Sequence, residues 1–156
     1  MTENIRAKIL AEALCEINRH GADFHMDDLA RNLRISKRTL YEHFSSKQEI
    51  IEQAISDFTN KIYTYHRRIV SDSTMTCEAK LIAYFDVPSD NWQVLSVRKA
   101  SELLTKMPDV WNRLQSRYEK DWRLLEQLLD EAQETGEFKP FDKFLFLRLL
   151  HSAAND

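Results

Sequence analysis

Glycine and proline are scarce in this 156-residue chain, which contains two glycines and three prolines. Because these residues form tight turns and interrupt helices, their scarcity argues against a β-rich fold with many turns. Hydrophobic residues make up 43% of the sequence, and they recur at helical spacing over long stretches. These features predict an all-α protein with short connections between its helices.

Long apolar runs and regularly spaced cysteines are also missing. No run reaches the roughly 18 residues expected of a transmembrane helix, and Glu12 and Glu16 interrupt the region where a signal peptide would be apolar. Cys15 and Cys77 have no metal-binding or redox spacing, so we expect free thiols. The sequence therefore predicts a cytoplasmic protein that does not contact a membrane.

The usual signatures of catalysis are missing as well. The sequence has no glycine-rich phosphate-binding loop, no Gly-x-Ser-x-Gly elbow and no His-Glu metal-binding pattern. The five histidines neither cluster nor pair with cysteine, which argues against a metal site. We therefore expect a protein that is not an enzyme and holds no cofactor or metal.

The most informative segment, residues 26–47, has the pattern of two short helices joined by a tight turn. A first helix over 27–33 would bury leucine and alanine side chains along one face. A second helix over 37–44 would bury Leu40 and Phe44, which are four residues apart. This pattern is that of a helix-turn-helix.

The outward face of the second helix is polar and basic. From Arg31 to Lys47 there are five basic side chains and one acid, Glu42, a net charge of +4. That sign suits a polyanion, and cations and hydroxyls are the groups that contact phosphates and base edges of DNA. The predicted DNA-contacting residues are Ser36, which can also cap the helix, and Lys37, Arg38, Thr39, Tyr41, His43 and Lys47.

Three of these residues have a structural alternative. Tyr41 could bury its ring beside Leu40, and His43 could be an ordinary surface imidazole. Lys47 could be a solvated charge, although a lysine in the first turn of a helix opposes the helix dipole unless an anion binds there.

Residues 5–54 resemble the amino-terminal DNA-binding domain of the TetR family of bacterial transcriptional regulators. The resemblance rests on Asp-Asp-Leu-Ala in the second helix, Ile-Ser-Lys-Arg-Thr-Leu-Tyr-Glu-His-Phe across the third, and Ser-Ser-Lys-Gln-Glu-Ile-Ile opening the fourth. It implies base or phosphate contact at Thr39, contact with the DNA backbone at Tyr41 and His43, and phosphate contact at Lys47. It also implies a homodimeric repressor that binds a pseudo-palindromic DNA operator and is released by a small-molecule effector.

Two arginines stand where this family often has glycine. A glycine at the position of Arg34 would accept a left-handed backbone at little steric cost, so either this arginine tolerates that geometry or the turn differs. Inside the second helix of the motif, Arg38 replaces glycine and can make a bidentate contact with guanine O6 and N7. The operator sequences of relatives therefore do not transfer to this chain.

Helical periodicity continues along the rest of the chain. A helix over 3–19 should end at Gly21, and a capping box at 46–49 should open a long fourth helix. Further helices are predicted over 77–85, 90–106, 108–135 and 141–153. We assign residues 1–50 to a helix-turn-helix domain and 51–156 to an effector-binding and dimerisation domain. That domain is expected to lack the final helix that the resemblance implies. Three explanations stay open: the protein is naturally short, the given sequence omits residues, or a reduced interface is made by Phe144, Leu145, Leu147, Leu149 and Leu150 alone.

Large aromatic residues concentrate in the carboxy-terminal part of the chain. They suit an effector pocket, but they equally suit an ordinary core and dimer interface. The candidate ligand-binding residues are Trp92, Met107, Trp111, Tyr118 and Trp122. The alternative function is a helical small-molecule-binding or protein-interaction bundle without operator recognition, against which the basic surface at 37–39 argues.

Overall fold

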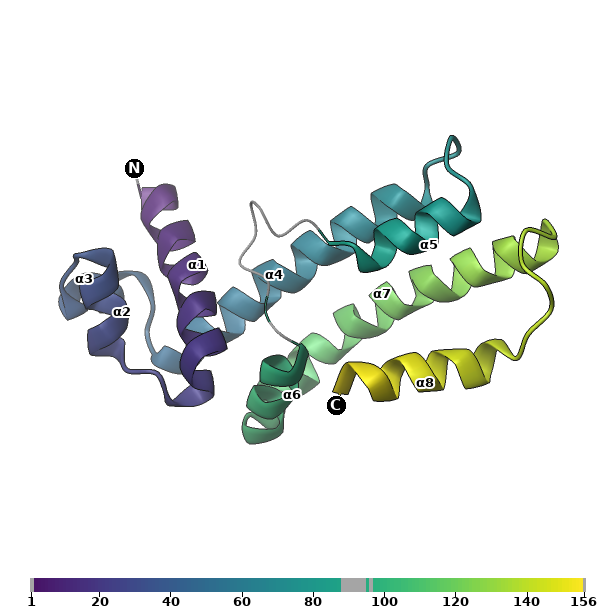
Figure 1. Ribbon diagram of the computed structural model, residues 1–156. Coiled ribbons are helices and arrows are strands. Elements are labelled where there is room, and N and C mark those ends of the chain that lie inside the picture. Colours follow the sequence, from purple (N-terminus) through teal and green to yellow (C-terminus); the bar gives the residue numbers. More distant parts are fainter. Residues whose placement is uncertain (1, 88–94, 96, 156) are drawn as a thin grey trace. The chain divides into compact units, whose positions relative to one another are not determined.

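The computed structural model describes residues 2–87, 95 and 97–155, and all regular structure in these ranges is helical (Figure 1). This confirms the predicted all-α fold. In the part of the chain that the structure describes, no helix is both long and apolar enough to span a bilayer. The helices are α1 (Thr2–His20), a 3-10 turn η1 (Gly21–Asp23), α2 (Met26–Leu33), α3 (Lys37–His43), α4 (Lys47–Val70), α5 (Cys77–Phe85), α6 (Val97–Lys106), α7 (Pro108–Glu134) and α8 (Lys143–Asn155).

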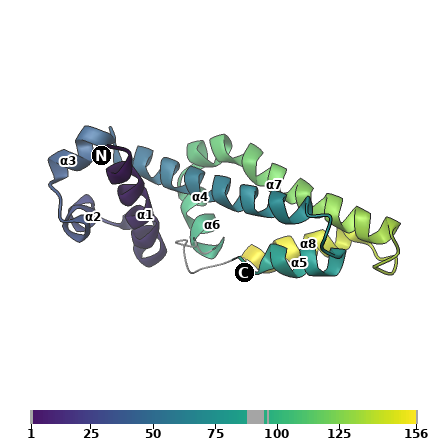
Figure 2. The ribbon, with the colours of Figure 1, turned by 90° about the horizontal axis from the view of Figure 1, so that it is seen from above.

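The chain divides into two compact units whose segments alternate along the sequence. Unit 1 comprises Met1–Phe58 and Asn91–Trp111, and unit 2 comprises Thr59–Asp90 and Asn112–Asp156. Two long helices, α4 and α7, therefore contribute residues to both units. Helix α4 has 24 residues, and it runs without interruption (Figure 2).

Unit 1 contains the helix-turn-helix. One face of α1 is buried through Ile9, Ala13 and Ile17, which recur every four residues as the helical pattern of the sequence predicts. Against this face pack α2 and η1, and α3 in turn packs on α2. Leu40 and Phe44 are 0% and 2% exposed, as predicted, and burying a side chain of this size contributes about 1.5–3 kcal/mol.

Arg34 occupies the turn between α2 and α3 in the left-handed conformation, with φ 55° and ψ 40°. Its N–H donates to the carbonyl of Arg31, and the N–H of Ile35 donates to the carbonyl of Ala30, each at 3.0 Å. The turn is thus the one that glycine would favour, made with an arginine instead. A side chain in this conformation costs about 1–2 kcal/mol, which the packing of the flanking helices must offset.

The starts of α3 and α4 are both capped by serine. Ser36 accepts the N–H of Thr39 at 3.0 Å, which confirms the predicted cap. Ser46 accepts the N–H of Glu49 at 3.1 Å, but the Glu49 carboxylate returns to the N–H and hydroxyl of Ser45, each at 2.6 Å. The predicted capping box therefore differs in one bond, because the Glu49 carboxylate accepts from Ser45 instead of from Ser46. These bonds from Ser45 hold the pKa of Glu49 below its usual range.

Unit 2 is a helical bundle in which α5 and α8 pack on the second half of α7. Buried Cys77 and Tyr84 on α5 meet Leu125, Leu128 and Leu129 on α7. One face of α8 closes this core through Phe146, Leu147 and Leu150. Its other face leaves three large apolar side chains exposed: Phe144 at 71%, Leu145 at 54% and Leu149 at 60%.

Two predicted helix starts are wrong. The helix expected from residue 90 begins at Val97, and the buried Leu95 before it is not helical; residues 90–94 and 96 lie outside the described residues. The helix expected from residue 141 begins at Lys143. It begins there because Asp142 caps it, accepting the N–H of Leu145 on its side chain at 2.9 Å.

Candidate nucleic-acid interface

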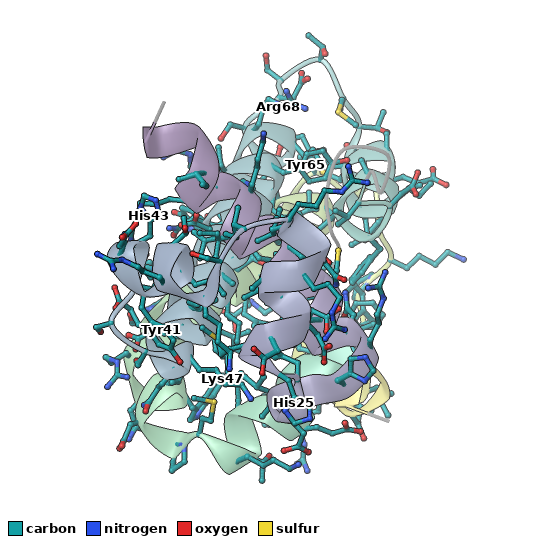
Figure 3. The ribbon with its side chains drawn as sticks, turned by 90° about the vertical axis from the view of Figure 1, so that its left-hand side faces the viewer. His25, Tyr41, His43, Lys47, Tyr65 and Arg68 are labelled. Atoms are coloured by element: carbon teal, nitrogen blue, oxygen red, sulfur yellow. The ribbon has the colours of Figure 1, made fainter. Side chains whose placement is uncertain are left out.

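The seven residues of α3 present most of the predicted DNA contacts on one side of unit 1. Lys37, Arg38 and Tyr41 are exposed, whereas Thr39 and His43 are half-buried. Tyr41 is 52% exposed, so its ring is not buried beside Leu40. In Figure 3, Tyr41 and His43 lie toward one edge of the view, and Lys47 lies nearer its middle.

The basic side chains of this surface are paired with acids. Lys37 Nζ lies 2.7 Å from Asp27 Oδ1, and this hydrogen bond raises the pKa of Lys37. Arg38 Nε donates to Glu42 Oε1 at 3.2 Å. Arg31 pairs with Asp28 at 2.8 Å on the neighbouring helix, so these three cations are each held by a carboxylate.

The amino-terminal end of α3 carries two hydroxyls that bond to each other. Ser36 Oγ and Thr39 Oγ1 are 2.9 Å apart, in addition to the backbone cap that Ser36 accepts. Both residues therefore hold the first turn of the helix in shape. A hydroxyl can donate and accept at once, so neither role excludes a DNA contact.

Lys47 has a structural role that its sequence position did not indicate. Its ammonium group donates to the carbonyl oxygen of Ala22 at 2.5 Å and lies 4.5 Å from the centre of the Phe24 ring. Partial burial lowers the pKa of Lys47 below its ordinary value. Lys47 thus connects the first turn of α4 to the segment between α1 and α2. Its contact with a DNA phosphate stays a prediction.

Arg6 is the residue of this site that sequence reasoning missed. Its guanidinium donates to the carbonyl of His43 at the end of α3 and, at 2.6 Å, to Gln53 Oε1 on α4. It also lies over the Phe44 ring, 4.3 Å from the centroid. These partners are 37 or more residues away in sequence, so no local pattern could have identified them.

The predicted ligand-binding residues fall into separate groups. Met107 and Trp111 are half-buried residues of unit 1, whereas Tyr118 and Trp122 belong to unit 2 and pack edge to face with centroids 5.9 Å apart. Trp122 also packs against the buried core of unit 2. Trp92 lies outside the described residues.

A buried polar cluster in unit 2 was not predicted. His66 Nδ1 lies 2.8 and 2.9 Å from the two carboxylate oxygens of Asp121, and its ring stacks on Tyr84 with centroids 3.7 Å apart. The Tyr84 hydroxyl donates to Asp121 Oδ2 at 3.1 Å, and burial, followed by the charge of Asp121, raises the pKa of Tyr84. His66 is 5% exposed, and its Nε2 atom is buried and has no hydrogen-bond partner among the described residues.

The helix-turn-helix of unit 1 matches a known protein family. Residues 9–54, which span the buried face of α1 through the first turns of α4, match the family model described as bacterial regulatory proteins, tetR family. Residues 9–54 form a TetR-family helix-turn-helix domain. The chain is a DNA-binding transcriptional regulator, as its sequence predicted.

Similarity to individual regulators extends beyond the helix-turn-helix. The chain is 26% identical over 148 residues to the HTH-type transcriptional regulator YvaF of Bacillus subtilis (strain 168), covering 95% of this chain and 78% of that protein. It is 23% identical over 117 residues to the HTH-type transcriptional repressor KstR2 of Mycolicibacterium smegmatis, covering 72% of this chain and 57% of that protein. A crystal structure of a TetR transcriptional regulator from Legionella pneumophila has the same fold, with a TM-score of 0.69, 24% identity and coverage of 95% of this chain and 81% of that chain.

The contacts of Lys47 predict that it stabilises the fold of the TetR-family domain. We expect Lys47→Ala to lower the free energy of unfolding by about 1–2 kcal/mol, because the Ala22 carbonyl loses a charged donor and Phe24 loses its cation. Urea denaturation measures this change, and Lys8→Ala, at an exposed position of α1, is the matched control. Unchanged stability, together with a fall of about one in the salt slope of DNA binding, would instead make Lys47 purely a phosphate ligand.

Proposed function

We propose that the protein represses transcription by binding a pseudo-palindromic operator as a homodimer, with one α3 in the major groove at each half-site. The observation that carries this proposal is the exposed polar face of α3, on which Arg38 and Tyr41 project from a capped helix. Arginine and tyrosine are side chains that contact bases and phosphates. Repression is proposed because the relative KstR2 is described as a repressor.

The proposed mode of docking predicts which side chains DNA binding needs. We expect the double variant Arg38→Ala, Tyr41→Ala to lose sequence-specific binding while its free energy of unfolding stays within about 0.5 kcal/mol of wild type, because both side chains are exposed. The measurement is a titration at fixed salt of a duplex selected from random sequences by the wild-type protein. Arg123→Ala, which removes an exposed, ion-paired arginine of α7, is the control.

Unaltered affinity in the double variant would remove α3 from the interface. If the wild-type protein selects no sequence at all and binds duplexes only at low salt, the alternative of a helical bundle without operator recognition takes the place of the repressor.

The second copy of the chain is proposed to cover the outward face of α8. Phe144, Leu145 and Leu149 are more than half exposed there, although large apolar side chains of this kind are normally buried. Leu145 and Leu149 are one helical turn apart, so they form a continuous stripe. The same stripe on a partner would make a self-complementary two-fold interface, and a two-fold protein suits a palindromic site. Leu147 and Leu150, also expected at the interface, contribute instead to the core of the chain itself.

This interface predicts a monomer when charge is placed on the stripe. We expect the variant Leu145→Glu, Leu149→Glu to keep its helical content but to lose dimerisation, since two buried carboxylates per subunit would face each other. Light scattering measures the mass directly, and Ile82→Glu, at a 63% exposed leucine-sized position of α5, is the control. A dimer of undiminished stability in the α8 variant would place the interface elsewhere.

An effector is proposed to bind in unit 2, beside Tyr118 and Trp122. Their edge-to-face pair offers an aromatic wall, and the unpartnered Nε2 of the neighbouring buried cluster at His66 offers a hydrogen-bonding atom. Side chains of these kinds suit an apolar or aromatic small molecule with one polar group. Because α4 carries His66 and also belongs to unit 1, a ligand that favours a different position of α4 would alter operator binding.

The effector proposal is tested with a panel of small aromatic compounds, scored by their ability to release the protein from its operator. We expect a releasing compound to lose about tenfold or more in potency against Trp122→Phe, because the indole contact and its area are reduced. Trp111→Phe tests the half-buried pair in unit 1 with the same change. A loss of potency confined to Trp111→Phe would move the site to unit 1.

A further inference from the structure

In the ion pair between Arg38 and Glu42, the carboxylate does not occupy the terminal nitrogens of the arginine, which are the atoms that can contact a base. Its hydrogen bond uses the Nε atom, 3.2 Å from Glu42 Oε1, so the terminal Nη1 and Nη2 groups remain for another partner. The Arg38 side chain is 88% exposed and that of Glu42 is 57% exposed. The two residues are one helical turn apart, so the carboxylate fixes the guanidinium from within the same face of α3.

Stability does not account for this pair. Exposed ion pairs contribute little to folding, and an arginine that precedes its acid by four residues is in the less favourable order on a helix. Orientation is a different matter. A guanidinium is planar, and its terminal N–H groups match guanine O6 and N7 only when the plane is presented edge-on to the base.

An orienting carboxylate has two opposite effects on DNA binding. It restricts the Arg38 side chain before DNA binds, so that Arg38 loses less conformational entropy when it contacts its base. This favours the correct base over others. It also brings a negative charge toward the phosphates, which weakens binding to every sequence alike. A residue of this kind therefore lowers non-specific affinity and raises discrimination.

We propose that Glu42 is a positioning residue that presets Arg38 for a guanine in each half-site, and so determines operator specificity without contacting DNA itself. This inference rests on the proposed docking of α3. Under this proposal an acidic residue, Glu42, joins the side chains of α3 that determine which DNA sequence is bound.

The test compares two acid-to-amide variants on the same surface. Glu42→Gln removes the charge that holds Arg38, and Asp27→Asn removes the charge that holds Lys37, 2.7 Å away. Each variant is titrated at fixed salt with the selected operator, with the operator in which the proposed guanine is replaced by adenine, and with a random duplex. Wild type should discriminate between the two operators by about 5- to 150-fold, the usual range for one bidentate contact.

For Glu42→Gln, we expect discrimination to fall at least threefold while affinity for the random duplex rises. For Asp27→Asn, affinity for the random duplex should rise similarly while discrimination stays at the wild-type value, because a lysine lacks the planar fork that needs presetting. Arg38→Ala should lose the discrimination altogether, which identifies the base that Arg38 reads and does not depend on Glu42.

Three results would overturn the inference in distinguishable ways. Unchanged discrimination in Glu42→Gln would show that Arg38 needs no orienting partner. An equal fall in Asp27→Asn would make the effect one of general charge. If Arg38→Ala recognises the operator as the wild-type protein does, Arg38 does not contact the guanine. If the wild-type protein selects no operator at all, the proposed function on which the inference rests is refuted instead.

Discussion

The exposed face of α3 depends on the contacts of Arg6, because these contacts hold the helix in place. With seven residues, α3 is far below the roughly 12–15 residues at which a helix becomes stable alone in water, so its neighbours must hold it in place. Arg6 does so at the carboxy-terminal end, where its positive charge also favours the helix dipole, and it binds α4 at the same time. With Ser36 at the other end and the buried Leu40 between them, both ends and one face of α3 are fixed, which leaves the outer face to vary with the DNA to be read.

Local patterns predicted the fold because the forces that shape it act locally. Helix α5 begins and ends at the predicted residues, since Thr76 supplies its cap and an amphipathic stretch follows. The helix-turn-helix was predicted because the spacing of its apolar residues allows one buried face. The start of α6 could not be predicted in this way, because Leu95 fits the apolar periodicity and is buried, but it is not helical.

The candidate site was harder to predict, because its chemistry depends on contacts between residues far apart in sequence. Counting charges from Arg31 to Lys47 gives +4, but Asp27 and Asp28 lie just before that window and pair with Lys37 and Arg31. From 27 to 47 the chain has five basic and three acidic residues, a net charge of +2. Lys47 donates to a backbone carbonyl 25 residues away, and only the folded chain reveals this partner.

In the proposed docking, the paired charges limit the non-specific affinity for DNA of a chain whose net charge is −3. Non-specific affinity comes from cations that release counterions from the phosphates, and it grows with each cation that is free to do so. In α2 and α3 the cations already have carboxylate partners, so a phosphate must compete with a carboxylate for each of them. That exchange returns little free energy on an arbitrary duplex, so the proposed docking requires base contacts to supply the remainder. Under that proposal, affinity would be greatest for the sequences whose bases α3 contacts.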